Sequence, residues 1–391
     1  MYRVQLVTAG ESHGPGLTAI LTGIPAGLII DTDFVQQELA RRQHGYGRGR
    51  RMQIESDEVE WRGGIRNSET LGSPITLWIR NRDFDNWSDV MGPLTIDAGR
   101  AEKRRLRSPR PGHADLAGGL KFTRRDLRDV LERASARESV ARVAAGSIAK
   151  LLLKEFGTEI RSGVRFLGEI GQSSPPPTWN DILAMDDTSP LRALDPTLEP
   201  EMIRRVDQAK AAGDTLGGAV TVIAHNVPVG LGSHIQWDEK LDGRLAQAVM
   251  SVPAVKAVEI GSALTTSRGP GSHAHDNIDF DTAKGWMRST NRAGGLEGGI
   301  SNGEDIVITA FKKPISTLRE GLPSIDLDSM TSAQGQYERS DVTALPAAGV
   351  IAESMVALAL ADAMLQKVGG DSLSEVRAHF EATRDLQSDW P

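Results

Sequence analysis

The chain has 391 residues, of which 39% are hydrophobic and 25% charged, a composition that excludes a disordered or peptide-sized protein and allows one large domain or two to three smaller ones. The formal net charge is −7, yet residues 1–150 carry 24 Lys and Arg against 19 Asp and Glu, which favours a local anion site over general nucleic-acid binding. The chain has no cysteine, which excludes disulfides, thiolate metal sites and cysteine nucleophiles.

Strands, turns and one helix are predicted in the first part of the chain. Alternating residues predict a strand at 3–6, and glycines predict a turn at 10–16 and a strand–turn–strand over 17–30. The other predicted elements are a helix at 33–42, a loop rich in glycine and arginine at 45–51, a strand at 75–79 and an irregular basic stretch at 83–111.

Residues 123–156 form the clearest predicted helix. Thr123 can cap its N-terminus, and Gly157 follows its end. Arg137 interrupts a stripe of small and aliphatic residues along this helix. This arginine either extends past its neighbours to water or is a buried guanidinium that holds an anion, and the pattern leaves both interpretations open.

Helices and strands alternate irregularly in the remainder. Without a regular βαβ rhythm, the pattern predicts an α+β fold rather than a doubly wound sheet. The predicted elements are a proline-rich linker at 173–177, an irregular excursion at 178–200, helices at 201–212, 240–249, 347–367 and 373–384, and strands at 217–225, 255–260 and 305–311.

No targeting or spanning segment is expected. The N-terminus lacks the long apolar region of a signal peptide. Glu353 and Asp362 interrupt the most apolar later stretch, 344–365, so a membrane-spanning helix is not expected there. We therefore expect a soluble, cytoplasmic protein with no membrane partner.

Two motifs place a histidine in a loop. His13 lies between glycines in Gly-Glu-Ser-His-Gly, where it can exchange protons, although a lone histidine there is more often structural. No nucleophile elbow surrounds Ser12, which argues against a serine hydrolase. His113 follows Arg110 in a loop stiffened by two prolines, and this pair suits phosphate recognition combined with proton donation.

Three further segments carry cations, glycines or an acid. Arginines occupy positions 41, 42, 48, 50 and 51 with no acid between them, which indicates either a solvated or RNA-contacting loop or a clamp on phosphate or carboxylate. Five glycines between 294 and 303 favour close approach of the backbone to a ligand, without the spacing of a dinucleotide fold. Residues 313–317 can hold a phosphate, and Asp341 is an ion-pair partner, a helix cap or a base.

In chain order, six of these segments together resemble the chorismate synthase family. They are Gly-Glu-Ser-His-Gly at 10–14, Arg-Pro-Gly-His-Ala-Asp at 110–115, Glu-Arg-Ala-Ser-Ala-Arg-Glu at 132–138, Gly-Gly-Ile-Ser-Asn-Gly at 298–303, Lys-Pro-Ile-Ser-Thr at 313–317 and Arg-Ser-Asp-Val at 339–342. The resemblance covers nearly the whole chain. It implies a single domain, 1–391, with a β-α-β sandwich of helices layered between two antiparallel sheets, usually assembled as a homotetramer.

The resemblance also implies a reaction. Chorismate synthases eliminate phosphate from 5-enolpyruvylshikimate 3-phosphate in a 1,4-anti sense to give chorismate, a carbon–oxygen lyase step of the shikimate pathway toward aromatic amino acids. The family requires reduced FMN although the reaction has no net redox change. NAD(P)H enters only indirectly, as a reductant, and we expect an outside reductant because no added reductase segment is visible.

Site residues follow from the same resemblance. His113 is expected to protonate the departing phosphate, His13 to protonate or stabilise the reduced flavin, and Asp341 to assist proton removal. The arginines expected to bind the substrate, or in part the nicotinamide cofactor NADP, are Arg42, Arg48, Arg51, Arg110 and Arg137. The residues expected at the flavin are Arg133, Ala134, Ser135, Pro253, Ala254, Gly298, Lys313, Pro314, Ile315, Ser316, Thr317 and Arg339, and no metal is expected.

Two other classes of function stay open at the level of the residues. An RNA-binding protein would use the loop at 45–51, but the acidic total and the scarcity of aromatic residues, at 5%, argue against it. A metal-dependent phosphatase would use histidines and aspartates as ligands. His273 and His275 come closest to a ligand pair, but no metal-ligand spacing is evident.

Overall fold

A computed structural model describes residues 3–48, 57–171, 175–186, 188–282, 285–338 and 340–388. Arg51, Arg339 and part of the predicted linker at 173–177 lie outside the described residues. The fold mixes helices with antiparallel sheets, which confirms the predicted α+β class.

The first sheet has four antiparallel strands. Its order is β1 (Gln5–Ala9), β2 (Gly16–Thr22), β6 (Ile75–Arg80) and β3 (Val59–Gly63). Alternate residues of β6, Ile75, Leu77 and Ile79, are buried, so one face of the sheet covers the core. The strand predicted at 3–6 lies two residues later than expected. The second strand predicted within 17–30 does not form, because Pro25 and Gly27, with φ of 90°, turn the chain into a loop.

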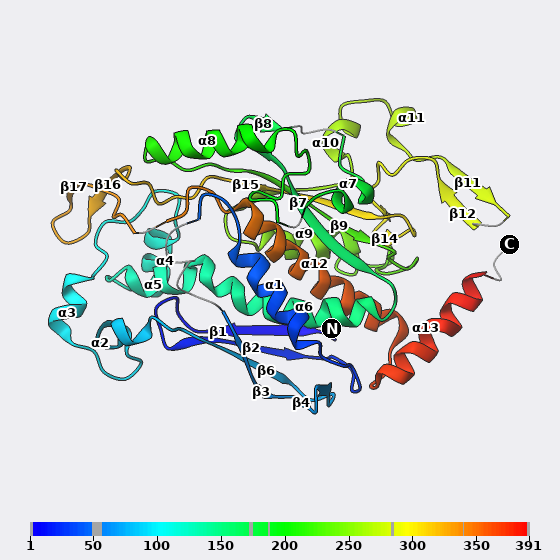
Figure 1. Ribbon diagram of the computed structural model, residues 1–391, viewed down its shortest axis with the longest axis horizontal. Helices are drawn as coiled ribbons and strands as arrows, with labels where there is room; N and C mark the ends of the chain where they lie inside the picture. Colours follow the sequence, from blue (N-terminus) through cyan, green and yellow to red (C-terminus); the bar gives the residue numbers. More distant parts are fainter. Residues whose placement is uncertain are drawn as a thin grey trace.

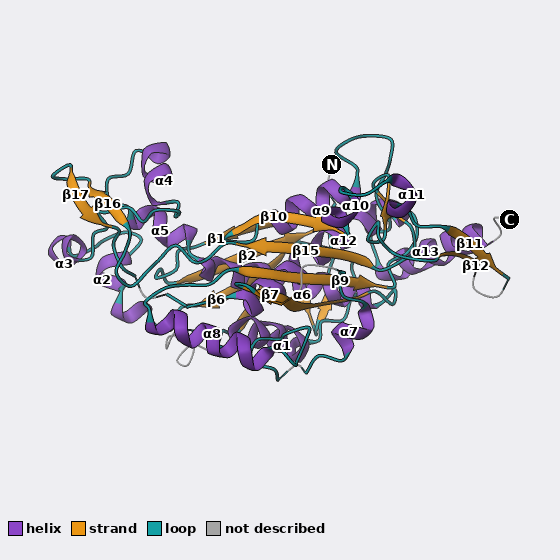
Figure 2. Ribbon diagram, turned by 90° about the horizontal axis from the view of Figure 1, so that it is seen from above, coloured by secondary structure: helices purple, strands orange, loops and turns teal. Residues whose placement is uncertain are grey.

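The second sheet has five antiparallel strands. Its order is β10 (Val255–Ile260), β15 (Ile306–Lys312), β9 (Gly218–His225), β7 (Glu159–Leu167) and β8 (Ile170–Gly171). The strands predicted at 217–225, 255–260 and 305–311 are confirmed. In Figure 2 these strands run side by side across the middle of the molecule.

Three helices form the layer between the sheets, where the first of them packs against the other two. They are α1 (Thr32–Gln43), α6 (Ser139–Lys154) and α12 (Leu345–Val368). Helix α6 packs on β2 and β6, whereas α12 packs on β7 and β9, as Figure 1 shows. Helices α6 and α12 approach closely at Gly146, where a Cβ atom would lie 2.3 Å from the side chain of Ser354. Helix α12 is apolar and long enough to cross a membrane, but 89% of its most apolar window is buried in the protein, as in a core helix.

The segment predicted as one helix over 123–156 is divided. Helix α4 (Asp115–Phe122) ends at Thr123, which adopts a left-handed conformation with φ of 55° and therefore ends one helix instead of beginning the next. Helix α5 (Arg128–Ala134) then stops at Ser135, whose backbone is extended and whose hydroxyl accepts a hydrogen bond from the Arg137 amide. A 3-10 turn, η3 (Ala136–Glu138), leads into α6. The break separates Arg137 from the regular helix.

The remaining elements are short helices and hairpins. They are β4 (Ile65–Arg66), β5 (Glu69–Thr70), η2 (Phe84–Asn86), α2 (Ser88–Met91), α3 (Ala98–Lys103), α7 (Trp179–Leu183), α8 (Glu199–Ala211), α9 (Leu241–Met250), α10 (Ala263–Thr266), α11 (Gly271–Ala274), β11 (Ile278–Asp281), β12 (Gly285–Arg288), β13 (Leu296–Glu297), β14 (Ile300–Ser301), β16 (Pro323–Asp326), β17 (Thr331–Gln334) and α13 (Leu373–Ser388). The stretches predicted as irregular at 83–111 and 178–200 thus contain η2, α2, α3 and α7, which are too short to show helical periodicity in the sequence.

A buried ionic network joins the three helices. Glu353 of α12 accepts hydrogen bonds from Lys150 of α6 at 2.5 Å and from Arg41 of α1 at 2.9 and 3.0 Å. Ser162 of β7 donates to the same carboxylate at 2.5 Å. Burial raises the pKa of Glu353, but the charges of Arg41 and Lys150 outweigh burial and hold the pKa well below its usual range. The network fixes the C-terminal end of α1, which carries Arg42.

We expect Glu353→Gln to lower the free energy of unfolding by roughly 3–5 kcal/mol, because Arg41, Lys150 and Arg192 lose a shared buried carboxylate and Glu38 alone remains to pair with Arg41 and Lys150. Urea unfolding measures this change. Glu381→Gln, which removes an exposed carboxylate paired with Arg384, is the matched control and should change stability by less than about 1 kcal/mol. An equally small change for Glu353→Gln would show that the network does not stabilise the helix packing.

Candidate functional site

Most of the predicted site residues that the structure describes come from separate elements that meet at the end of the helix layer near α4 and α5 (Figure 1). His13 comes from the loop after β1, and Arg42 and Arg48 from the end of α1 and the loop beyond it. Arg110 and His113 precede α4, whereas Arg133, Ala134, Ser135 and Arg137 surround the break between α5 and α6. The segment 313–317 follows β15, and Asp341 precedes α12. Direct contacts link these segments in pairs.

His13 is held by a buried glutamate. Its backbone N–H donates to Glu132 Oε2 at 2.8 Å, and its Nδ1 lies 2.9 Å from the same oxygen. The Glu132 side chain is fully buried and also accepts a hydrogen bond from Arg128 at 3.0 Å. Burial raises the pKa of Glu132, but hydrogen bonds and charge from His13, with the charge of Arg128, outweigh it and lower the pKa. An ionised carboxylate therefore orients the imidazole.

An aromatic ring covers the other side of this pair. The Trp87 ring lies 4.0 Å from the His13 ring, centroid to centroid. The guanidinium groups of Arg104 and Arg128 lie 4.0 and 5.2 Å from the Trp87 centroid. The electron-rich face of Trp87 attracts the two guanidinium groups, and its contact with the His13 ring limits how far His13 can move.

His113 is held in the same way by Asp115. Its Nδ1 lies 2.5 Å from Asp115 Oδ1, and Arg110 donates to the two Asp115 oxygens at 2.8 and 3.0 Å. Arg110 also donates to the Thr317 hydroxyl at 2.9 Å, so the 110–115 loop contacts the 313–317 segment. Burial raises the pKa of Asp115, but hydrogen bonds and charges from His113 and Arg110 hold it far below its usual range.

Asp57 joins two of the predicted arginines. Arg42 Nη2 lies 2.6 Å and Arg137 Nη1 3.2 Å from its carboxylate oxygens. All three side chains are buried, so Arg137 is a buried guanidinium and the alternative that it extends to water is wrong. Burial lowers the pKa of Arg42, and the charges of Arg48 and Arg137 lower it further, while Asp57 opposes both. The Arg42 Nε atom is buried and has no hydrogen-bond partner in the described part of the chain.

Arg48 and Asp341 form the third pair, with Nη1 and Oδ2 3.0 Å apart. Lys313, the residue after β15, donates a hydrogen bond to the Gly112 carbonyl at 2.5 Å and so contacts the loop that carries His113. Arg133 donates to the Gly10 and Thr8 carbonyls at 3.1 and 2.9 Å, and Ser135 donates to the Ser12 hydroxyl at 3.2 Å. These bonds fix the loop that carries His13.

The other residues predicted at a flavin divide into two places. Pro253 and Ala254 lie before β10, and the Ala254 carbonyl accepts a hydrogen bond from the Lys313 amide at 2.9 Å. Pro314, Ile315 and Ser316 continue the 313–317 segment, where the Ile315 carbonyl accepts from Thr215 at 2.7 Å. Gly298 lies apart, in the turn of the β13–β14 hairpin beside His234, and Figure 1 places that hairpin far along the molecule from α4 and α5.

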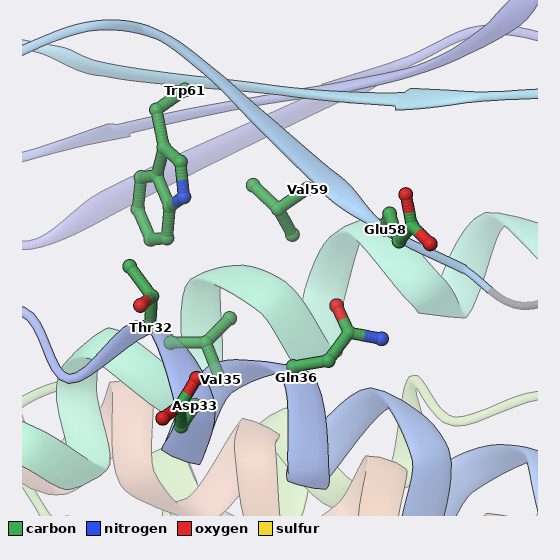
Figure 3. Close-up of a pocket in the computed structure, with 7 residues that line it drawn as sticks. All are labelled: Thr32, Asp33, Val35, Gln36, Glu58, Val59 and Trp61. Carbon is green, nitrogen blue, oxygen red and sulfur yellow. The ribbon is translucent and has the colours of Figure 1, made fainter.

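The site cations do not line the cavity between α1 and β3. That cavity, about 350 Å³, is lined by Thr32, Asp33, Val35, Gln36, Glu58, Val59 and Trp61 (Figure 3). Its charged lining residues, Asp33 and Glu58, are acids, so it does not suit an anion. Asp57 is adjacent to this cavity, because its backbone carbonyl accepts a hydrogen bond from the lining residue Gln36 at 2.7 Å. Among the described residues no group of three or more histidines and acids has the arrangement of a metal site.

The comparisons with known proteins agree with one another. A family model described as chorismate synthase matches residues 4–365. The chain is 50% identical over 385 residues to a chorismate synthase of Geobacter sulfurreducens, a match that covers 97% of this chain and 98% of the relative. A chorismate synthase of Brevibacillus brevis is 47% identical over 381 residues, with 97% and 98% covered.

The chain belongs to the chorismate synthase family. A solved crystal structure of a chorismate synthase superposes with a TM-score of 0.78 at 40% identity, covering 98% of this chain and 97% of that one. Family membership confirms the resemblance found in the sequence, while the roles of single residues stay predictions.

Sequence reasoning missed the partners that hold the chorismate synthase motifs together. Asp115 and Glu132 lie within the motifs named above, but no role was predicted for them. Nothing in the sequence pointed to Asp57 or Trp87 as site residues. A carboxylate two residues after His113 was the one usable clue. Glu132 and Asp57 lie 119 and 80 residues from their partners His13 and Arg137, so only folding brings them together.

We expect Asp115→Asn to lower the free energy of unfolding at pH 7 by about 1.5–3 kcal/mol, because charged hydrogen bonds to His113 and Arg110 are lost. The folded state holds the pKa of Asp115 below its unfolded value, so this contribution is present above about pH 4 and disappears at lower pH. Urea unfolding from pH 7 to pH 2 should therefore show the difference from wild type shrinking below pH 4. Asp129→Asn, at an exposed pair with Arg124, is the control, and a difference independent of pH would contradict the assignment.

Proposed function

We propose that this protein is a chorismate synthase that eliminates phosphate from 5-enolpyruvylshikimate 3-phosphate with reduced FMN. The observation that carries the proposal is the pairing of two histidines with buried carboxylates next to clustered arginines, in a chain of the chorismate synthase family. The elimination breaks the C–O bond to phosphate and removes a ring proton, so it needs an acid, a proton acceptor and a cationic pocket.

The arginines suit the charge of the substrate, which carries two carboxylates and a phosphate. Arg42 and Arg137 share Asp57, and Arg48 has Asp341, so the site holds more positive than negative charge. Because these groups are buried or largely shielded from water, an anion that enters interacts with them more strongly than it would in water. The buried Nε atom of Arg42 is a donor that such an anion can satisfy.

The residues also suit reduced FMN. Lys313, Ser316 and Thr317 follow one strand end and combine an ammonium with two hydroxyls, the donor set that a phosphate monoester needs. The buried hydroxyl of Thr343, two residues after Asp341, has no hydrogen-bond partner in the described residues and is one more available donor. When bound, the reduced flavin supplies the electron density that weakens the C–O bond.

Each acid–base residue then has one task. His113, oriented by Asp115, donates a proton to the leaving phosphate oxygen. His13, oriented by Glu132, is a proton donor on the flavin side. Asp341, beside Arg48, assists removal of the ring proton.

We also propose the finer properties that the family implies. Contacts of α6 with the first sheet and of α12 with the second support the β-α-β sandwich, and the main apolar core, which includes Leu77 and Val220, supports a single domain. A homotetramer in the cytoplasm, with NAD(P)H only as an indirect reductant of the flavin, belongs to the same proposal.

The decisive experiment follows phosphate release from 5-enolpyruvylshikimate 3-phosphate under anaerobic conditions, with FMN oxidised or chemically reduced. We expect release, together with chorismate, only with reduced FMN. Release regardless of flavin state, and lost on chelation, would indicate a metal-dependent phosphatase. Absence of release combined with steeply salt-dependent RNA binding would indicate the RNA-binding alternative.

His113→Ala is expected to lower turnover by roughly 10²–10⁴-fold, the usual loss when a general acid is removed, and His13→Ala should act in the same direction. Steady-state phosphate release with reduced FMN measures both. His273→Ala, at an exposed position on α11, is the matched control and should leave turnover unchanged. If both site variants stay within severalfold of wild type, the assigned proton donors are wrong.

A further inference from the structure

Lys312 is a buried lysine that none of the family motifs includes. It is the last residue of β15 and only 8% exposed. It pairs across the sheet with Gly218 of β9 and Val255 of β10. Directly paired residues of neighbouring strands point to the same face of a sheet. A Cβ atom on Gly218 would lie 2.7 Å from the Leu345 side chain of α12, so this face looks toward the start of α12.

The surroundings of Lys312 are those of the candidate site. Asp341 on the approach to α12, Arg48 in the loop after α1 and Lys313 on its own strand end are the charged groups that act on its ammonium. The Gly47 carbonyl accepts a hydrogen bond from the Val342 amide at 2.9 Å, which ties the Arg48 loop to the Asp341 segment. Thr343, the residue after Val342, has a buried hydroxyl that finds no hydrogen-bond partner among the described residues.

The Lys312 ammonium makes no hydrogen bond or close ion pair with any residue that the structure describes, although the Lys313 ammonium beside it does. Burial, together with the charges of Arg48 and Lys313, lowers the pKa of Lys312 to about 8, and Asp341 only partly opposes this shift. The Lys312 side chain is only 8% exposed, so its ammonium loses much of its hydration and gains no protein hydrogen bond in return, which is unfavourable. A bound anion would supply that partner.

We propose that Lys312 is an anion ligand of this site, that its ammonium contacts a phosphate monoester, and that it takes up a proton from solvent when that anion binds. The proposal rests on the proposed function, which supplies two phosphate monoesters, that of the substrate and that of FMN. Either source has the same chemistry, and the titrations below distinguish them.

Isothermal titration calorimetry at pH 8 in two buffers of different ionisation enthalpy measures affinity and proton uptake together. The probes are 5-enolpyruvylshikimate 3-phosphate, oxidised FMN and inorganic phosphate, each titrated separately. A lysine with a pKa of about 8 is half protonated at this pH, so the wild type should take up about half a proton for each anion that Lys312 contacts.

Lys312→Met, of similar length but uncharged, should weaken binding of that probe about 10- to 100-fold and abolish the proton uptake. Lys312→Arg keeps a charge that does not titrate in this range, so it should retain most of the affinity without the uptake. Lys256→Met, on the exposed side of β10, is the matched control and should change neither quantity. Retained binding by Lys312→Arg shows that the site still folds.

A loss confined to the substrate assigns Lys312 to the substrate phosphate, and a loss confined to FMN assigns it to the flavin phosphate. Wild-type affinity of Lys312→Met for all three probes, or proton uptake that persists in this variant, would overturn the proposal. If the wild type binds neither the substrate nor FMN, the proposed function fails, and inorganic phosphate still tests Lys312. Wild-type protein that does not bind inorganic phosphate either would overturn the inference as well.

Discussion

Buried carboxylates that hold cations are the constraint on which this structure depends. Asp57 holds Arg42 and Arg137, Asp115 holds Arg110 and His113, and Glu132 holds Arg128 and His13. Each carboxylate is almost completely buried, so leaving it without its cation would cost much more than at the surface. The cations are therefore fixed before any ligand arrives, and a site made for anions does not need to reorganise when one binds.

The same principle operates inside the helix layer. Glu353 receives donors from α1, α6 and β7, and this places the end of α1, with Arg42, relative to the break between α5 and α6, with Arg137. The break itself matters as much as the network. A continuous helix would keep Ser135 and Arg137 on a regular helical surface, whereas the extended backbone at Ser135 lets its hydroxyl reach Ser12.

The fold was predictable where local signals were strong. The strands β9, β10 and β15 and the helices α1 and α12 follow from their apolar patterns, because each buries one face or lies wholly in the core. The division of 123–156 was not predictable, because Thr123 and Ser135 are compatible with both a helix cap and a helix interior. The left-handed conformation of Thr123 depends on the chain turning after α4.

The sequence by itself determined the chemistry of this protein: which histidines, arginines and glycines it carries, in which motifs and in which order, and so its family. Only the tertiary structure decided which of these residues meet. Asp57 contacts Arg137 and Glu132 contacts His13, although long stretches of chain separate the partners. The register of β15 with β9 places Lys312 on the sheet face that lies toward the start of α12. Spacing along a chain encodes contacts within a helix or strand, whereas contacts between elements depend on packing and burial, which no local pattern records.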